Sequence, residues 1–251
     1  MITFSVIVPC YNSEATVVTC VRSIFSQTRL PEEIIVIDDG SKDNTSSLLE
    51  TLKVECPLGV NFYIILQKNS GPSAARNSGI KKATSSWIAF LDSDDYWESN
   101  NLSIMSSFIE TFNECVLFGG SEQLKHLSFN TLLYRNYFQT STTVVKKQMI
   151  LNHLFNEKQS YSEDYRAWLN ISYEGKVTLV PGYQAFPVIN RINSFSGNGL
   201  SSKLFKMELG ELNNFWGLMK ENKITFFKFS VISVYSFFKY LRRCLKQGKI
   251  S

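Results

Sequence analysis

The amino-acid sequence predicts an α/β fold in which a mostly parallel sheet is covered by helices on both faces. Short apolar runs rich in β-branched residues, which are typical of buried strands, occur four times in the first hundred residues. Segments with helical spacing separate these runs, and polar clusters lie where the strands would end. The four strands are expected at residues 4–8, 34–37, 62–66 and 87–91.

Local capping signals agree with this order. Asn12 or Ser13 can cap a first helix, and Pro72 suits a first helical turn because proline lacks the N–H that a helix start leaves unpaired. The second half of the chain is less regular. Further strands are expected at 142–145, 177–180 and 186–189, and a helix at 163–171. The length of 251 residues and the 44% hydrophobic content suit one large globular domain with a small appendage.

The charge is distributed unevenly along the chain. Residues 1–202 hold 16 Lys and Arg against 19 Asp and Glu, a net charge of −3, whereas residues 203–251 hold 10 against 3, a net charge of +7. The basic character therefore belongs to the C-terminal tail, which argues against a nucleic-acid partner and favours an acidic surface. The composition also shifts near residue 200, so we divide the chain into a domain at 1–202 and a tail at 203–251.

Cysteine usage indicates a reducing compartment. The five cysteines are an odd number, and no two have the CxxC spacing of a zinc or redox site. The N-terminus enters a strand directly and lacks the basic and apolar pattern of a signal peptide. A cytoplasmic setting is therefore expected.

Four polar clusters follow the predicted strands in order. They are Val8–Asn12, Val36–Asp43, Gly71–Gly79 and Phe90–Asp95. As a set, they resemble the motifs of family-2 glycosyltransferases, and the resemblance covers residues 4–98. It implies a GT-A fold with a Rossmann-like sheet, a nucleotide-sugar-binding half at 1–98 and an acceptor-binding half at 99–202. It also implies transfer of a hexose or N-acetylhexosamine from a nucleotide diphosphate sugar, with a UDP-sugar favoured.

The first two clusters are candidates for holding the nucleotide base. Tyr11 offers a flat aromatic face, and Asp39 can accept the N–H of a uracil-like base. In similar proteins these positions hold the base, and Pro9 and Asn12 belong to the same donor-binding loop. The alternative is that the second cluster, around Asp39, is only a turn with a helix cap.

The third and fourth clusters are candidates for holding the diphosphate. Asp92 and Asp94 form a DxD pattern, and hard carboxylate ligands suit the Mg²⁺ or Mn²⁺ that would stabilise a departing diphosphate. The resemblance assigns Asp94 to the metal and Asp92 to the ribose or sugar as well as the metal, and leaves Asp95 without a role. It also brings Arg76 to the phosphate or donor sugar. The alternatives are a solvated acidic loop and a surface arginine.

The run Ser162–Tyr165 resembles the acidic signature that follows DxD in the family. By this resemblance Asp164 is the general base of an inverting reaction and takes the proton of the acceptor hydroxyl. Glu163 is expected to contact the acceptor or hold the geometry. The alternative is an acidic pair that complements the helix dipole. A weaker resemblance at Asn190–Ser196 assigns Arg191 to the donor.

The basic tail is rich in phenylalanine. Its longest uncharged run, Phe229–Phe238, has 10 residues, which is too short to span a bilayer. Helical spacing predicts a basic stripe opposite an apolar stripe, which suits an interfacial helix on an anionic membrane; packing on protein is the alternative. The basic stripe comprises Lys228, Tyr235, Lys239, Arg242 and Lys246, and the apolar stripe comprises Phe226, Phe237, Leu241 and Cys244.

Similar bacterial enzymes use lipid-linked sugars as acceptors. The resemblance therefore implies surface-polysaccharide synthesis on the cytoplasmic face of the bacterial inner membrane, with an acceptor such as an undecaprenyl-diphosphate-linked saccharide. Two other classes of protein are alternatives. A nucleotidyltransferase would need a Gly- and Lys-rich loop after the first strand, which Pro9–Ser13 does not provide. A catalytically silent nucleotide-sugar-binding module could lose Asp94 or Asp164, and both are present.

Overall fold

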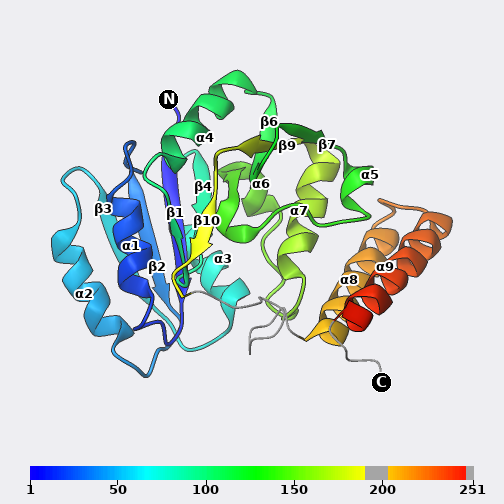
Figure 1. Ribbon diagram of the computed structural model, residues 1–251, viewed down its shortest axis with the longest axis horizontal. Coiled ribbons are helices and arrows are strands. Elements are labelled where there is room, and N and C mark those ends of the chain that lie inside the picture. The colour runs from blue at the N-terminus through cyan, green and yellow to red at the C-terminus, as the bar shows by residue number, and fades with distance from the viewer. Residues whose placement is uncertain (190–202, 247–251) are drawn as a thin grey trace.

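A computed structural model describes residues 1–189 and 203–246. An eight-stranded sheet with the order β3-β2-β1-β4-β8-β6-β9-β7 forms the centre of the molecule (Figure 1). The first four strands in this order run parallel, as the strand–helix–strand order predicts. Their bounds are β1 Phe4–Cys10, β2 Glu33–Asp38, β3 Asn61–Leu66 and β4 Trp87–Phe90.

The other half of the sheet is mixed. β8 (Thr143–Lys146) runs antiparallel to both β4 and β6 (Cys115–Ser121), which is parallel to β9 (Lys176–Pro181). The edge strand β7 (Lys125–Leu127) is antiparallel to β9. A separate two-stranded sheet pairs β5 (Asp95–Trp97) with β10 (Ala185–Pro187), near the strand expected at 186–189. This pairing brings the acidic loop after β4 beside a segment far away in the sequence.

Alternation along the parallel strands divides the core into two layers. On β1, Ile7 faces one layer, whereas Val6 and Val8 face the other. One face is covered by α1 (Val17–Phe25), α2 (Thr45–Glu55) and α4 (Asn101–Thr111). The opposite face is covered by α3 (Pro72–Lys82), α5 (Phe129–Leu132), α6 (Lys147–Asn152) and α7 (Glu163–Glu174). The prediction of helices on both faces is confirmed.

A glycine lets α3 approach the sheet closely. A Cβ added at Gly79 would lie 2.7 Å from a methyl carbon of Ile7 and 2.8 Å from one of Ile37. A side chain at position 79 would therefore push α3 away from β1 and β2. Because Arg76 is one helical turn earlier, this contact also sets the depth of Arg76 relative to the strand ends.

The C-terminal segment forms a hairpin of two helices, α8 (Leu204–Lys220) and α9 (Phe226–Lys246). In Figure 1 the hairpin lies at the end of the molecule opposite α2, next to α7. Its inner residues Phe215, Leu218 and Ile232 join the same core layer as α7. No helix among the described residues is long and apolar enough to cross a membrane. The expected boundary at residue 202 falls outside the described residues.

The predicted division of α9 into a basic and an apolar stripe is wrong at three positions. Lys239 donates to Glu211 Oε2 at 3.0 Å, and Lys228 donates to the hydroxyl of Tyr134 at 3.2 Å, so these two basic side chains turn toward the protein. Cys244, expected on the apolar stripe, is buried. The error arises because helical spacing gives the relative angle of residues but not which side meets α8.

Candidate active site

The carboxyl ends of β1, β2 and β4 open into a cleft of about 740 Å³. Loops that follow the parallel strands contribute most of its lining, as expected for a sheet of this kind. Seven of the predicted donor-site residues share this cleft, namely Pro9, Tyr11, Asn12, Asp39, Arg76, Asp92 and Asp94. Folding thus brings together residues that are up to 85 positions apart.

The loop after β1 presents the aromatic ring and is tied to the loop after β2. Tyr11 keeps 45% of its surface exposed at the cleft, so its ring is accessible for stacking. Asn12 has a left-handed backbone with φ of 49°, which asparagine tolerates better than most residues. Its amide oxygen accepts from the N–H of Lys42, and its own N–H donates to Ser41 Oγ. Two hydrogen bonds therefore join the loops that follow β1 and β2.

Asp39 is engaged by the protein itself. Its Oδ1 accepts from the Gln67 amide at 2.7 Å and from the N–H of Ser70 at 2.9 Å, and its Oδ2 accepts from the N–H of Gly71 at 2.8 Å. A carboxylate has about four acceptor positions, so these bonds leave room for one further donor. Asp39 therefore holds the loop before α3, a role that the sequence did not suggest.

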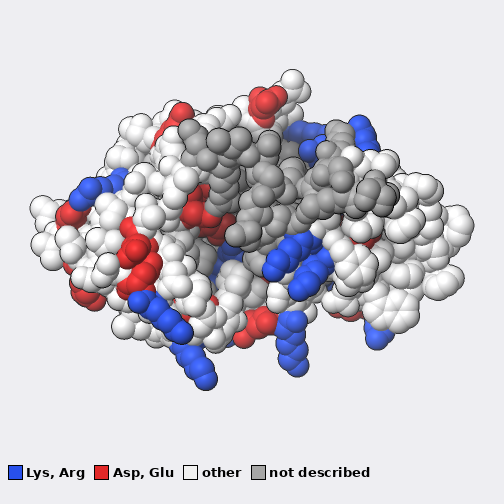
Figure 2. All heavy atoms as spheres, turned by 60° about the horizontal axis from the view of Figure 1, so that its bottom comes forward, with Lys and Arg blue, Asp and Glu red and all other residues white. Residues whose placement is uncertain are grey.

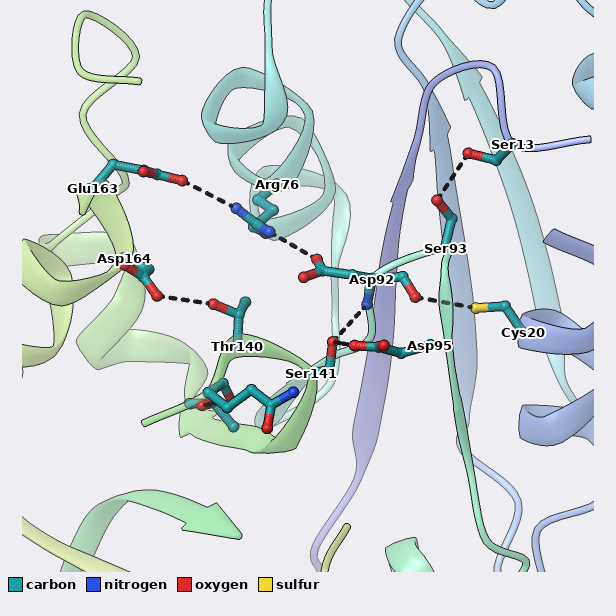
Figure 3. Close-up of polar contacts among 12 residues, drawn as sticks. Ser13, Cys20, Arg76, Asp92, Ser93, Asp95, Thr140, Ser141, Glu163 and Asp164 are labelled. Carbon is teal, nitrogen blue, oxygen red and sulfur yellow. Dashed lines mark hydrogen bonds and ion pairs between the residues drawn. The ribbon is translucent and has the colours of Figure 1, made fainter. Parts of the chain in front are cut away.

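Arg76 lies between the acidic loop after β4 and the acidic pair of α7. Its Nη2 donates to Asp92 Oδ1 at 2.7 Å, and its Nη1 lies 3.5 Å from Glu163 Oε1 (Figure 3). The side chain is only 8% exposed and also packs over the ring of Phe155, 5.6 Å from its centroid. The alternative of a surface arginine is therefore wrong.

The environment of Arg76 keeps its guanidinium charged. Burial alone would lower the pKa of Arg76, but the negative charges of Asp92, Glu163 and Asp164 raise it above its ordinary value. One buried positive charge thus offsets part of the repulsion among three carboxylates. This arrangement keeps a concentrated acidic site folded.

The acidic loop after β4 divides into residues that line the cleft and one that faces inward. Asp92 and Asp94 are in the cleft lining, and the backbone carbonyl of Asp94 accepts from the N–H of Val188 at 2.8 Å. Asp95 is buried and accepts a hydrogen bond from Ser141 Oγ at 2.5 Å. Burial raises the pKa of Asp95 above its ordinary value. Asp95 is therefore a structural residue of the loop, and the alternative of a purely solvated acidic loop is wrong for it.

The carboxylates of Asp92 and Asp94 suit a cation that is also bound by the phosphates of a substrate. In the described part of the chain, no group of three or more His, Cys, Asp or Glu side chains could hold a metal ion. Asp92 and Asp94 of this loop both line the cleft, whereas the third carboxylate of the lining, Asp39, is bonded to the loop before α3. Mg²⁺ typically binds through one or two carboxylates together with substrate phosphates, so two protein carboxylates suffice once a diphosphate is present.

The acidic pair of α7 lies on the far side of Arg76 from Asp92. Glu163 is buried, and burial followed by the charge of Asp164 raises the pKa of Glu163, against the opposing charge of Arg76. Burial likewise raises the pKa of Asp164, whereas Arg76 and hydrogen bonds from the N–H of Tyr165 and the hydroxyl of Thr140 lower it. A carboxylate with a raised pKa is a stronger base than an exposed one.

A short 3₁₀ turn at Thr140–Thr142 connects the two acidic segments (Figure 3). Thr140 Oγ1 donates to Asp164 Oδ2 at 3.2 Å. The neighbouring Ser141 Oγ accepts from the N–H of Asp92 and donates to Asp95. These hydroxyls were missed because hydroxyl residues at the start of a predicted strand carry no distinctive spacing.

Asn77 also has a structural role that was not predicted from the sequence. Its amide nitrogen donates to the carbonyl of Phe155 at 2.9 Å, and its amide oxygen accepts from the N–H of Phe155 at 3.0 Å. The Arg-Asn pair of α3 therefore holds the segment that leads to α7. Arg191, the remaining predicted donor residue, lies outside the described residues.

Comparison with known proteins agrees with this site. The family model of glycosyl transferase family 2 matches residues 5–166, which include the acidic pair of α7 and the whole cleft lining except Ile189. The chain belongs to glycosyl transferase family 2. A curated relative, the Escherichia coli UDP-Glc:alpha-D-GlcNAc-diphosphoundecaprenol beta-1,3-glucosyltransferase WfgD, is 32% identical over 189 residues, covering 70% of this chain and 72% of the relative. The nucleotidyltransferase alternative is not supported.

Solved structures of other glycosyltransferases have the same fold as this family 2 glycosyltransferase. Staphylococcus aureus TarS in complex with UDP-GlcNAc superposes with a TM-score of 0.70 at 18% identity, covering 87% of this chain and 67% of that one. Against a longer TarS structure, this chain spans 40% of its length. The mannosyltransferase PcManGT from Pyrobaculum calidifontis, in complex with GDP-Man and Mn²⁺, has a TM-score of 0.67 at 16% identity, covering 86% of this chain and 64% of that one. The GT-A fold expected from the motifs is confirmed.

Proposed function

We propose that this family 2 glycosyltransferase transfers a hexose or N-acetylhexosamine, with inversion, from a UDP-sugar to a hydroxyl of a lipid-linked saccharide. The observation that carries the proposal is the arrangement around Arg76. A nucleotide-sized cleft with Asp92 and Asp94 lies on one side, and the raised-pKa carboxylates of Glu163 and Asp164 lie on the other. An inverting transfer needs a donor and a base on opposite sides of one carbon.

The proposed reaction is a single displacement. Asp164 takes the proton of the acceptor hydroxyl while that oxygen forms a bond to the anomeric carbon. The bond between this carbon and the diphosphate oxygen breaks, and its electron pair leaves with the nucleoside diphosphate. Glu163 orients the acceptor, and Arg76 orients both Glu163 and Asp92. Thr140 orients the carboxylate of Asp164.

The donor is supported by the shape and chemistry of the cleft. Tyr11 provides an exposed ring, and one acceptor position of Asp39 remains for the N–H of a base. WfgD uses UDP-Glc according to its name, and TarS was crystallised with UDP-GlcNAc. Asp92 and Asp94 would hold Mn²⁺ or Mg²⁺, which would stabilise the charge that develops on the leaving diphosphate.

The acceptor and the cellular setting are proposed from the relatives and the cysteines. WfgD acts on a diphosphoundecaprenol-linked sugar, and we propose an acceptor of this class. All five cysteines are free, which agrees with a reducing compartment. We therefore assign the reaction to the cytoplasmic face of the inner membrane.

Replacing the proposed base tests the mechanism. Asp164→Asn keeps the size of the side chain and removes the basic oxygen, so kcat should fall by about 10²–10⁴-fold with nearly unchanged donor affinity. Steady-state kinetics with UDP-sugars, together with calorimetric titration of UDP, separates the two quantities. As a control, Asp95→Asn changes a buried carboxylate of the loop after β4 that accepts from Ser141 and is not part of the cleft lining, and it should lower kcat less than Asp164→Asn does.

Two results would contradict the proposed roles. Near-normal kcat in Asp164→Asn would move the base elsewhere, with Glu163 as the first candidate. Loss of UDP binding in the same variant would place Asp164 in the nucleotide site. Absence of transfer by the unchanged protein with every UDP-sugar, despite UDP binding, would favour the silent binding module.

A further inference from the structure

One face of α9 is apolar and exposed along the length of the helix. Its large apolar side chains are between 40% and 78% exposed. They are Phe226, Phe227, Val231, Val234, Tyr235, Phe237, Phe238 and Leu245. At about 100° per residue these positions fall within one half of the helix circumference. We call this set the α9 outer face.

The α9 outer face is not the side of the helix that packs on the rest of the protein. The opposite side of α9 already packs inward through Ile232, Ser236 and Cys244, all of which are buried. Phe229 and Ile232 belong to the core layer that contains α7. The helix is therefore held on its inner side, and its outer face remains apolar for another reason.

The exposed side of α8 extends the same surface. Phe205, Leu209 and Trp216 are spaced at helical intervals and are at least 43% exposed. The Phe205 ring contacts Tyr240 of α9 with centroids 6.4 Å apart, and Trp216 contacts Phe229 with centroids 5.7 Å apart. The apolar surface thus continues across both helices of the hairpin.

The acidic side chains of the tail are either buried or paired with basic side chains. Residues 203–251 contain three acidic residues, all glutamates. Glu208 and Glu211 are buried between the helices, and Glu211 pairs with Lys239 and Arg243 at 3.0 and 3.2 Å. The third, Glu221, lies in the turn and pairs with Arg166 and Lys223.

The hairpin carries basic side chains at its surface, and two of them also contact aromatic rings: Lys206 Nζ lies 5.8 Å from the ring centroid of Tyr161, and Lys220 Nζ lies 5.2 Å from that of Trp216. Lys203, Lys206, Lys220 and Arg242 are exposed. Figure 2 shows the outer end of the hairpin, at the right, as a largely uncharged surface without a patch of acidic side chains. The surface therefore combines exposed aromatic and aliphatic groups with a border of one sign of charge.

We propose that the α8–α9 hairpin docks flat on an anionic lipid surface, with the α9 outer face inserted among the lipids. An amphipathic helix of 21 residues with aromatic side chains on one face and basic residues at its border has the chemistry of interfacial helices. Anionic head groups complement the exposed Lys and Arg side chains. A second copy of the chain fits less well, because a two-fold contact would bring like charges together. The proposal depends on this surface and not on the identity of the sugar acceptor.

Sedimentation of the full chain with vesicles tests the proposal without any sugar substrate. The unchanged protein should sediment with vesicles of phosphatidylglycerol and phosphatidylcholine in equal parts, and less with phosphatidylcholine alone. The triple variant Phe227→Ser, Phe238→Ser, Leu245→Ser should lower the partition coefficient on the order of 100-fold. Arg242→Ser and Lys206→Ser should each lower it roughly fivefold on the mixed vesicles.

The matched control is an exposed apolar pair at the other end of the molecule. Val54→Ser with Leu58→Ser, at the end of α2, removes apolar side chains that are 89% and 100% exposed, and should bind vesicles like the unchanged protein. Circular dichroism and melting temperature verify that each variant is folded. Failure of the unchanged protein to bind the mixed vesicles overturns the proposal. Equal binding to neutral vesicles, or a dimer that the triple variant dissociates without any vesicle binding, overturns it as well.

Discussion

Arg76 determines the electrostatics of the active site at the scale of single residues. Its buried guanidinium contacts Asp92 of the loop after β4 at 2.7 Å and lies 3.5 Å from Glu163 of α7. A lysine could not form both contacts with one planar group, because its ammonium is a compact point charge on a flexible stem. The acidic loop after β4 and the acidic pair of α7 therefore share one cationic side chain.

Thr140 offers a test of how the proposed base is oriented. Thr140→Val keeps the shape of the side chain and removes the hydroxyl that donates to Asp164 at 3.2 Å. This bond stabilises the ionised carboxylate and lowers its pKa, so its loss should raise the pKa of Asp164 further. Because the base must be ionised, the acidic limb of the pH–rate profile should shift to higher pH.

The size of the fall in kcat distinguishes a residue that orients the base from the base itself. A hydrogen bond to a charged group contributes about 1.5–3 kcal/mol, so kcat at neutral pH should fall by on the order of 10–100-fold, which is less than for Asp164→Asn. Thr140→Ser, which retains the hydroxyl, serves as the matched control and should restore the original pH profile. An unchanged acidic limb in Thr140→Val would show that the hydroxyl does not act on the base.

At the scale of elements, the two helices of the hairpin are joined by a buried ionic cluster as well as by apolar packing. Glu211 of α8 accepts from Lys239 and Arg243 of α9 and from Ser236. Burial alone would raise the pKa of Glu211, but the two basic side chains keep it below its ordinary value. A group whose pKa is lowered by folding stabilises the fold above its unfolded pKa, and this contribution is lost as the pH falls through the folded pKa.

Glu211→Gln should therefore loosen α9 at neutral pH. The variant keeps the shape but leaves Lys239 and Arg243 without their carboxylate, so the free energy of unfolding should fall by about 1–3 kcal/mol. Amide exchange across residues 226–246 should speed up, and the acid-dependent loss of stability below pH ~4.5 should become smaller. These quantities are measured by hydrogen exchange and by denaturant titration at several pH values.

Glu208, one turn earlier on α8, is the matched control. Burial raises the pKa of Glu208, so its ionised form costs stability once the pH rises above its unfolded value. Glu208→Gln should consequently leave the neutral-pH stability unchanged or increase it by about 1 kcal/mol. Equal destabilisation by both substitutions would indicate that packing, and not charge, holds the two helices together.

At the scale of the whole molecule, the active site is built from segments that only the complete sheet brings together. Loops after β1, β2, β3 and β4 line the cleft, and α7 supplies the acidic pair from beyond residue 160. Ligand binding at such a site is coupled to the stability of the entire domain, because the native state alone presents all the contacts.

Thermal shifts should reveal the order in which nucleotide and cation bind. Because the loop after β4 offers two cleft carboxylates and no metal-binding group of three or more acidic, His or Cys side chains occurs among the described residues, Mn²⁺ alone should leave the melting temperature nearly unchanged. UDP with Mn²⁺ should raise it by several degrees, and EDTA should remove most of this increase. Asp94→Ala should abolish the Mn²⁺-dependent part while retaining some UDP binding. A full shift with UDP in EDTA would contradict a role for the metal in donor binding.

The sequence by itself determined the fold class, the positions of the parallel strands and most of the residues that line the cleft. The reason is that strand periodicity and motifs such as Val8–Asn12 and Phe90–Asp95 are local patterns, and the carboxyl ends of parallel strands necessarily meet at one edge. Family membership was predictable on the same basis, and the family model confirms it.

Only the tertiary structure decided which partners these residues have. The spacing of residues 76, 92 and 163 contains no signal that one guanidinium lies between two carboxylates, and Asp39 gave no indication that it holds the loop at 67–71. The orientation of α9 was equally inaccessible, because periodicity specifies two opposite faces and packing on α8 selects which one is buried. Lys239 therefore turns toward Glu211, and the aromatic side chains of α9 remain on the outside.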